Sequence, residues 1–104
     1  MAADLAKLQQ LIHEYNVVRS EIVALRSRIA ELRSAKSVLE EKRPRTVFRI
    51  IGPVMVETGL EEALSFIEDE LEVSELRLRR LEEQEKKLAK TIEELERRLG
   101  IAPS

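Results

Sequence analysis

A regular spacing of apolar residues constrains this chain more than any other feature. In two long stretches the steps between these positions alternate between three and four residues. A period of 3.5 residues keeps one stripe of an α-helix against a partner helix, as in a coiled coil. We therefore expect two long helices, over about residues 3–43 and 59–99. The first series is Leu8, Leu11, Tyr15, Val18, Ile22, Leu25, Ile29, Leu32, Lys36 and Leu39, and the second is Leu60, Leu64, Ile67, Leu71, Ser74, Leu78, Leu81, Glu85, Leu88, Ile92, Leu95 and Leu99.

Three polar residues interrupt these series: Lys36 in the first, and Ser74 and Glu85 in the second. Polar residues at such positions fix register and partner choice in some coiled coils. In others they only loosen the packing locally. Both interpretations stay open for these three residues.

Two signals mark the end of the first helix and the start of the second. Pro44 cannot continue a helix, so the first helix should end near Arg43. Thr58 and Glu61 match a capping box, in which each side chain accepts a hydrogen bond from the other residue's backbone N–H.

A third signal marks the end of the second helix. Gly100 suits the left-handed backbone position that follows a last helical turn. Ile101 would then pack back on the helix, and Pro103 would prevent its continuation.

The two predicted helices are nearly equal in length and joined by a short segment, so we expect them to pack antiparallel. Their charges favour the same arrangement. Seven acids and no base lie between Glu61 and Glu75, and the stretch opposite carries four bases: Arg33, Lys36, Lys42 and Arg43. The expected register places Ile29 near Leu71, Ile22 near Leu78, Tyr15 near Glu85 and Leu8 near Ile92.

Between the helices lies the one segment without helical periodicity, TVFRIIGPVMVETG at residues 46–59. Apolar and β-branched residues flank a Gly52-Pro53 turn, which predicts a single β-hairpin over about residues 46–57. Alternation along the strands puts apolar side chains on both faces. Because a lone hairpin is marginal in water and its edges invite pairing, we expect another chain to cover it. The predicted assembly residues are Val47, Phe48, Ile50, Ile51, Val54, Met55 and Val56.

Composition argues against most enzymatic and membrane functions. The chain has 104 residues, 37% of them charged, only three aromatic residues and no cysteine. Its single histidine, His13, lacks the partners of a metal site, and no catalytic motif is present. We expect one domain over residues 1–104, with no metal, no cofactor and no catalytic residue, and so no enzyme.

Charge and hydropathy address the remaining partner classes. The net charge of −2 disfavours nucleic-acid binding, which needs a basic surface. No run approaches the roughly 20 apolar residues of a membrane span, so no membrane partner is expected. The absence of cysteine fits a reducing compartment, and we expect a cytoplasmic protein.

The order helix, hairpin and returning helix resembles the β-type subunit of prefoldin, an ATP-independent cytosolic chaperone of archaea and eukaryotes. The resemblance is carried by the hairpin VFRIIGPVMVE and by a second helix ending in LEEQEKKLAKTIEELERRLG. It implies a mainly α fold, a long antiparallel two-helix coiled coil with one β-hairpin at the bend, and hairpins that assemble into an intersubunit β-barrel. Two features depart from the family: a short join at residues 42–45 and a first helix poor in glutamine.

The resemblance also implies partners. These are an α-type subunit with two hairpins, further copies of this chain in a hexamer of two α and four β subunits, unfolded proteins, and a group II chaperonin that receives them. Two alternatives stay open: a coiled-coil tether or adaptor, and a homo-oligomeric prefoldin-like protein without an α partner.

In the family, unfolded clients are held at the free ends of the helices. Antiparallel helices of about 40 residues would bring both chain termini together roughly 60 Å from the hairpin. The residues predicted to bind clients there are Leu5, Leu8, Ile12, Ile92, Leu95, Leu99 and Ile101. Four of them also belong to the apolar series and would equally serve to hold the helices together; Leu5, Ile12 and Ile101 lie outside it.

Overall fold

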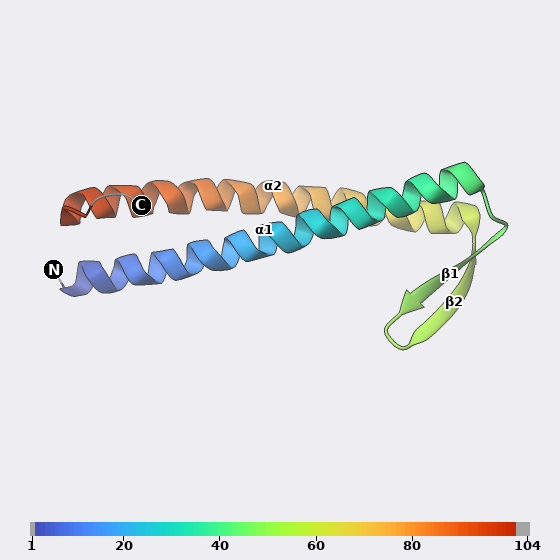
Figure 1. Ribbon diagram of the computed structural model, residues 1–104, viewed down its shortest axis with the longest axis horizontal. Helices are drawn as coiled ribbons and strands as arrows, with labels where there is room; N and C mark the ends of the chain where they lie inside the picture. Colours follow the sequence, from blue (N-terminus) through green and yellow to red (C-terminus); the bar gives the residue numbers. More distant parts are fainter. Residues whose placement is uncertain (1, 102–104) are drawn as a thin grey trace. The chain divides into compact units, whose positions relative to one another are not determined.

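The computed structural model describes residues 2–101 and contains two helices and one hairpin. In chain order they are α1 (Ala2–Lys42), β1 (Thr46–Ile51), β2 (Val54–Gly59) and α2 (Leu60–Leu99) (Figure 1). The predicted element order is confirmed, and each helix end lies within one residue of its expected position. The hairpin is longer than predicted, because β2 continues through Thr58 to Gly59 and leads directly into α2.

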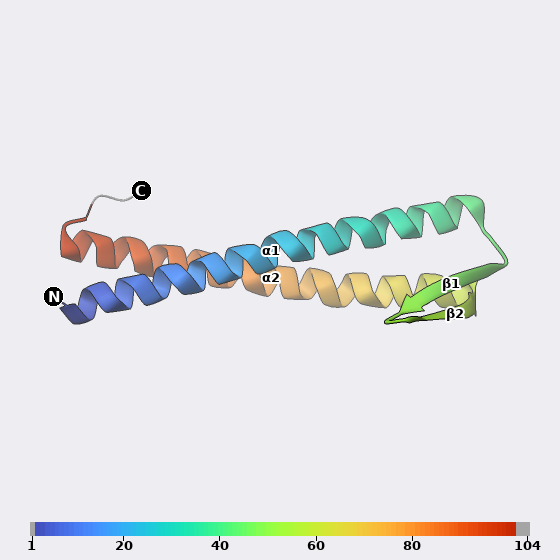
Figure 2. The same ribbon diagram turned by 60° about the horizontal axis from the view of Figure 1, so that its bottom comes forward.

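The chain divides into two compact units, which are described separately. The terminal unit combines Met1–Leu25 with Arg77–Ser104, and the hairpin unit spans Arg26–Leu76. In the terminal unit the helices run antiparallel, since Asp4 near the start of α1 pairs with Arg98 near the end of α2 at 3.9 Å. Figures 1 and 2 both show these two helix ends side by side.

The core of the terminal unit is a narrow seam between the two helices. One cluster contains Leu8, Leu11 and Leu95, with Leu88, Ile92 and Leu99 packed against it. A second contains Val18, Ile22 and Leu81, with Leu25, Leu78 and Leu88 packed against it. These clusters join Leu8 with Ile92 and Ile22 with Leu78, which confirms the predicted register in this unit.

The hairpin unit has a similar seam and is flanked by ion pairs. Its buried apolar residues are Ile29, Leu32, Ala63, Leu64, Ile67 and Leu71. Three cations of α1 and the segment after it reach acids of α2: Arg33 to Glu75 at 3.1 Å, Lys36 to Glu68 at 3.7 Å, and Arg43 to Glu61 at 3.0 Å. Each exposed pair contributes little stability. All three join a base on or just after α1 to an acid on α2, which confirms the predicted charge pairing of the helices.

The helix ends confirm one capping prediction and overturn another. At the end of α2, Gly100 has φ 71° and donates to the carbonyl of Arg97 at 3.1 Å, while the N–H of Ile101 donates to the carbonyl of Glu96 at 2.9 Å. These two bonds form the Schellman motif expected for Gly100. Pro103, also expected to stop this helix, lies outside the described residues.

The predicted capping box at the start of α2 is wrong. The hydroxyl of Thr58 is buried and has no hydrogen-bond partner within residues 2–101. Thr58 lies in the strand ladder opposite Val47, and the carboxylate of Glu61 binds Arg43 instead. Arg43 itself ends α1 with φ 44° and an N–H bond of 2.9 Å to the carbonyl of Leu39, directly before Pro44.

Candidate assembly and client-binding surfaces

The hairpin is built around a tight turn with a fixed register. Ile51 pairs with Val54, Ile50 with Met55, and the two residues between the strands are Gly52 and Pro53. Gly52 has φ 57°, which a two-residue hairpin turn requires at its first position. Among the described residues the sheet has two strands, so each strand keeps one open edge.

The two faces of the hairpin are both apolar, but one is more exposed than the other. One face carries Phe48, Ile50 and Met55, all exposed, with Ile50 at 76%. The other carries Arg49, whose guanidinium lies 3.7 Å from the centroid of the Phe66 ring on α2. Four aliphatic residues share that second face: Val47, which is half-buried, and Ile51, Val54 and Val56, which are exposed.

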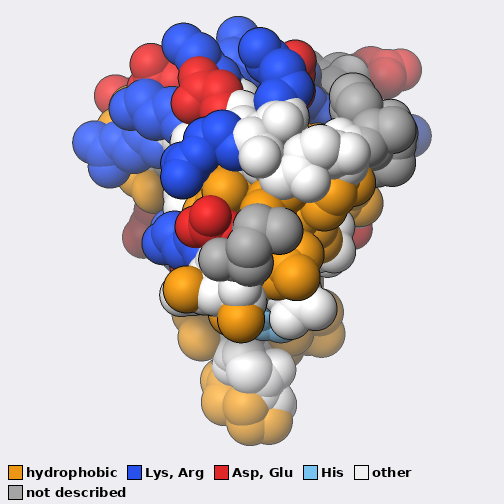
Figure 3. Space-filling model, turned by 90° about the vertical axis from the view of Figure 1, so that its left-hand side faces the viewer, with side chains coloured by type: hydrophobic (Ala, Val, Ile, Leu, Met, Phe, Trp, Pro, Cys, Tyr) orange, Lys and Arg blue, Asp and Glu red, His pale blue; other side chains and the backbone are white. Residues whose placement is uncertain are grey.

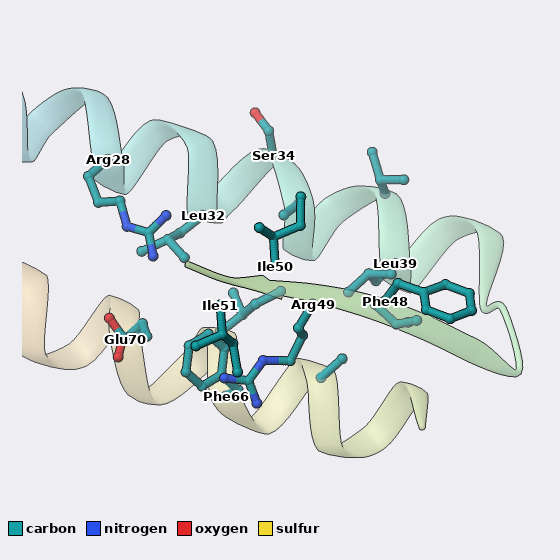
Figure 4. Close-up of a pocket in the computed structure, with 15 residues that line it drawn as sticks. Arg28, Leu32, Ser34, Leu39, Phe48, Arg49, Ile50, Ile51, Phe66 and Glu70 are labelled. Atoms are coloured by element: carbon teal, nitrogen blue, oxygen red, sulfur yellow. The ribbon is translucent and has the colours of Figure 1, made fainter. Parts of the chain in front are cut away.

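A groove of about 820 Å³ lies in the hairpin unit between β1 and the two helices (Figure 4). Leu32, Leu39, Ile51 and Phe66 contribute to its apolar lining. Figure 4 shows Arg49 and Ile51 beside Phe66. Sequence reasoning missed this groove; the available signal was Phe66, a large apolar residue outside the helical series.

The residues predicted to bind clients separate into two groups by burial. Leu8 and Leu95 are each 6% exposed, and Ile92 and Leu99 are half-buried, so all four pack in the seam. In contrast, Leu5 is 45% exposed, and Ile12 and Ile101 are exposed as well. Figure 3 views this end of the terminal unit and shows apolar side chains next to a group of Lys and Arg side chains.

One protein-family model matches the chain over all of its described residues. Residues 2–102 match the model described as Prefoldin subunit. The chain belongs to the prefoldin subunit family.

Among prefoldin subunits, this chain is of the β type. It is 31% identical over 104 residues to the prefoldin subunit beta of Sulfurisphaera tokodaii, covering 96% of this chain and 81% of that protein. It is 34% identical over 76 residues to the prefoldin subunit beta of Thermococcus onnurineus, covering 69% of this chain and 66% of that protein. The crystal structure of the prefoldin beta subunit from Thermococcus strain KS-1 superposes with a TM-score of 0.80 at 25% identity, covering 99% of this chain and 93% of that one.

Prefoldin is a chaperone subunit family and not an enzyme family. Residues 2–101 contain no group of three or more His, Cys, Asp or Glu side chains placed to hold a metal ion. Neither α1 nor α2, as far as they are described, has an apolar stretch long enough to cross a membrane.

Two of the three polar residues in this prefoldin subunit's seam have ion-pair partners on the opposite helix. Lys36 reaches Glu68, and Glu85 pairs with Arg19 at 3.4 Å. The same guanidinium donates to the hydroxyl of Tyr15 at 3.4 Å and lies 5.9 Å from its ring centroid. The hydrogen bond to Tyr15, together with the electrostatic attraction of Tyr15 and Glu85, holds the pKa of Arg19 above its ordinary value. The predicted neighbours Tyr15 and Glu85 are therefore joined through one arginine that sequence reasoning did not single out.

Proposed function

We propose that this β-type prefoldin subunit forms part of an ATP-independent holdase, which captures unfolded proteins and passes them to a group II chaperonin in the cytoplasm. The observation that carries the proposal is the exposure of apolar side chains at two places with different surroundings. One is the hairpin, with open strand edges, and the other is the end of the terminal unit. Exposed apolar patches of this kind favour contact with other proteins.

The hairpin serves assembly in this proposal. Its seven predicted residues present apolar surface next to unpaired backbone groups, which is what strand pairing between subunits requires. Hairpins of neighbouring subunits then close into a β-barrel, in a hexamer of two α-type and four β-type chains. A homo-oligomer without an α partner would use the same surface and is an outcome of the mass measurement described below.

The end of the terminal unit serves client capture. Leu5, Ile12 and Ile101 make the first contacts, because they are exposed while the helix pair is intact. Leu8, Ile92, Leu95 and Leu99 become available when the last turns open, since helix ends have the lowest local stability. Binding is therefore weak and reversible, as a holdase requires.

The test is suppression of aggregation of a chemically unfolded protein by the assembled complex. A variant with Leu5→Ser, Ile12→Ser and Ile101→Ser removes exposed apolar surface at the terminal end and leaves the seam in place. The matched control changes two exposed valines of the same unit, Val17→Ser and Val23→Ser. We expect the triple variant to lose most of the suppression and the control to keep it, both with unchanged native mass.

Two results would count against this assignment of roles. If the wild-type complex leaves aggregation at its spontaneous rate, the chain acts as a tether or adaptor. If the triple variant loses its native mass, the terminal residues serve assembly and not capture.

A further inference from the structure

A second, smaller groove lies in the terminal unit between α1 and α2. It has a volume of about 360 Å³. Its apolar lining is formed by Ile12, Tyr15, Ala89 and Ile92, and two carboxylates, Glu93 and Glu96, also line it. Among residues 2–101, no lysine or arginine lines this groove, so the formal charge of its lining is negative.

Comparison with the hairpin unit indicates the position at which a cation would be expected beside this groove. There, Arg33 on α1 pairs with Glu75 on α2 at 3.1 Å. Moving three heptads toward the chain termini, back along α1 and forward along α2, gives Ile12 and Glu96. Because a coiled coil repeats every seven residues, Ile12 occupies the flanking position at which an arginine would pair with Glu96.

The type of residue at this flanking position changes along α1. Arg19, Arg26 and Arg33 follow one another at seven-residue steps, and the same steps then lead to Ile12 and Leu5. The matching positions of α2 are Glu75, Glu82, Ala89 and Glu96, so an acid is present again opposite Ile12. The arginines of α1 thus give way to aliphatic side chains only near the chain terminus.

The two acids in the groove are not neutralised from α1. Glu96 is half-buried and forms no ion pair within the described part of the chain. Glu93 pairs with Arg97 on its own helix at 2.8 Å, and Arg19, one heptad from Ile12, is held by Tyr15 and Glu85. The groove therefore combines an apolar lining with an unmatched carboxylate.

We propose that this groove binds a large apolar side chain of an unfolded polypeptide that has a lysine or arginine next to it in sequence. The apolar side chain fills the space between Ile12, Tyr15 and Ile92, and the cation takes the place of the missing arginine beside Glu96. The inference rests on the proposed function, because it names the class of client that the terminal unit prefers. The volume lies within the range of pockets that bind small ligands, enough for a few side chains of an extended segment.

Tyr15 provides a direct readout. It is the only tyrosine, and the chain has no tryptophan, so tyrosine fluorescence reports on this groove alone. The probes are two unstructured peptides free of Tyr and Trp, each with a central leucine pair, flanked by lysine in one and by glutamate in the other. We expect the lysine peptide to bind the full-length chain about two- to fivefold more tightly, with the preference fading as salt is added.

Two variants separate the groove from general charge effects. Glu96→Gln should remove most of the preference while leaving binding of the glutamate peptide intact or improved. Ile12→Arg supplies the missing cation in place and should abolish the Tyr15 response to both peptides. The matched control is Val23→Arg, which adds the same charge at an exposed position of the same unit outside the groove and should bind like wild type.

The outcomes distinguish this inference from the proposed function. Equal affinity for both peptides, unaffected by Glu96→Gln, overturns the inference, and aggregation suppression that persists would still support the holdase. Peptide discrimination without any aggregation suppression supports the groove and contradicts the holdase. A Tyr15 signal that changes with protein concentration alone would assign the groove to a neighbouring copy and overturn the inference.

Discussion

Truncation of a single seam residue should show how much the narrow core contributes to stability. Ile22 is 2% exposed and lies in the cluster with Val18 and Leu81. Ile22→Ala removes three buried carbon atoms, each worth about 0.8 kcal/mol by transfer, and leaves a cavity. A two-helix seam can close partly around a cavity, so we expect a loss in unfolding free energy near the lower end of the usual range, about 2–3 kcal/mol.

The neighbouring residue provides the control. Val23 is 62% exposed, and Val23→Ala removes little buried surface while gaining the higher helix propensity of alanine, about 0.5 kcal/mol. We expect its unfolding free energy to change by less than about 0.5 kcal/mol. The assay is urea unfolding followed by circular dichroism at a fixed protein concentration, because assembly and folding are coupled. Equal destabilisation by the two changes would refute the seam as the source of stability in the terminal unit.

Three further predictions test the hairpin, the register and the helix end. Ile50→Asp puts a charge on the most exposed apolar residue of the hairpin and should lower the native mass of the complex, with the helical circular dichroism kept; an unchanged mass would exclude this face from assembly. Cysteines introduced at positions 22 and 78 should form a disulfide efficiently, since both residues belong to one cluster and the chain has no other cysteine, whereas preferential crosslinking of positions 22 and 92 would contradict the register. Gly100→Ala forces a left-handed backbone at a cost of about 1–2 kcal/mol and should speed amide exchange in the last turn of α2 by roughly 5- to 30-fold; exchange at the wild-type rate would mean that the Schellman motif does not hold this end.

The seam and the pairing of the helices could be predicted from the sequence because they follow from periodicity and charge. The 3,4 spacing identified Leu8, Ile22 and Leu95 as contact positions, and all three are buried. The acids after Glu61 and the bases after Arg33 identified the antiparallel pairing. Both signals are repeated many times, so single exceptions do not obscure them.

Features that depend on one local choice were harder to predict. The capping box was predicted wrongly because Thr58 could serve either as a helix cap or as a strand residue. In the structure Thr58 belongs to the strand ladder, and Glu61 pairs with Arg43. The Tyr15, Arg19 and Glu85 contacts depend on how far a long side chain reaches across the seam, which the spacing of apolar residues does not specify.

The candidate surfaces could be predicted from the sequence only in part. Apolar and β-branched residues around a Gly-Pro turn identified the hairpin, and only burial in the structure separated Leu5 and Ile12 from the seam leucine Leu8. The negative groove required knowledge of which residues flank the seam on both helices, so it emerged only once Glu96 and Ile12 were placed on one surface.

The exposed hairpin, with its open strand edges, should make this prefoldin chain a subunit of a larger complex. Native mass spectrometry of the full chain tests it most directly, first alone and then mixed with an α-type subunit. We expect a mass well above the 12.0 kDa of one chain, and with the partner a hexamer that contains four copies of it. A single 12.0 kDa species in both samples would show that the hairpin does not drive assembly.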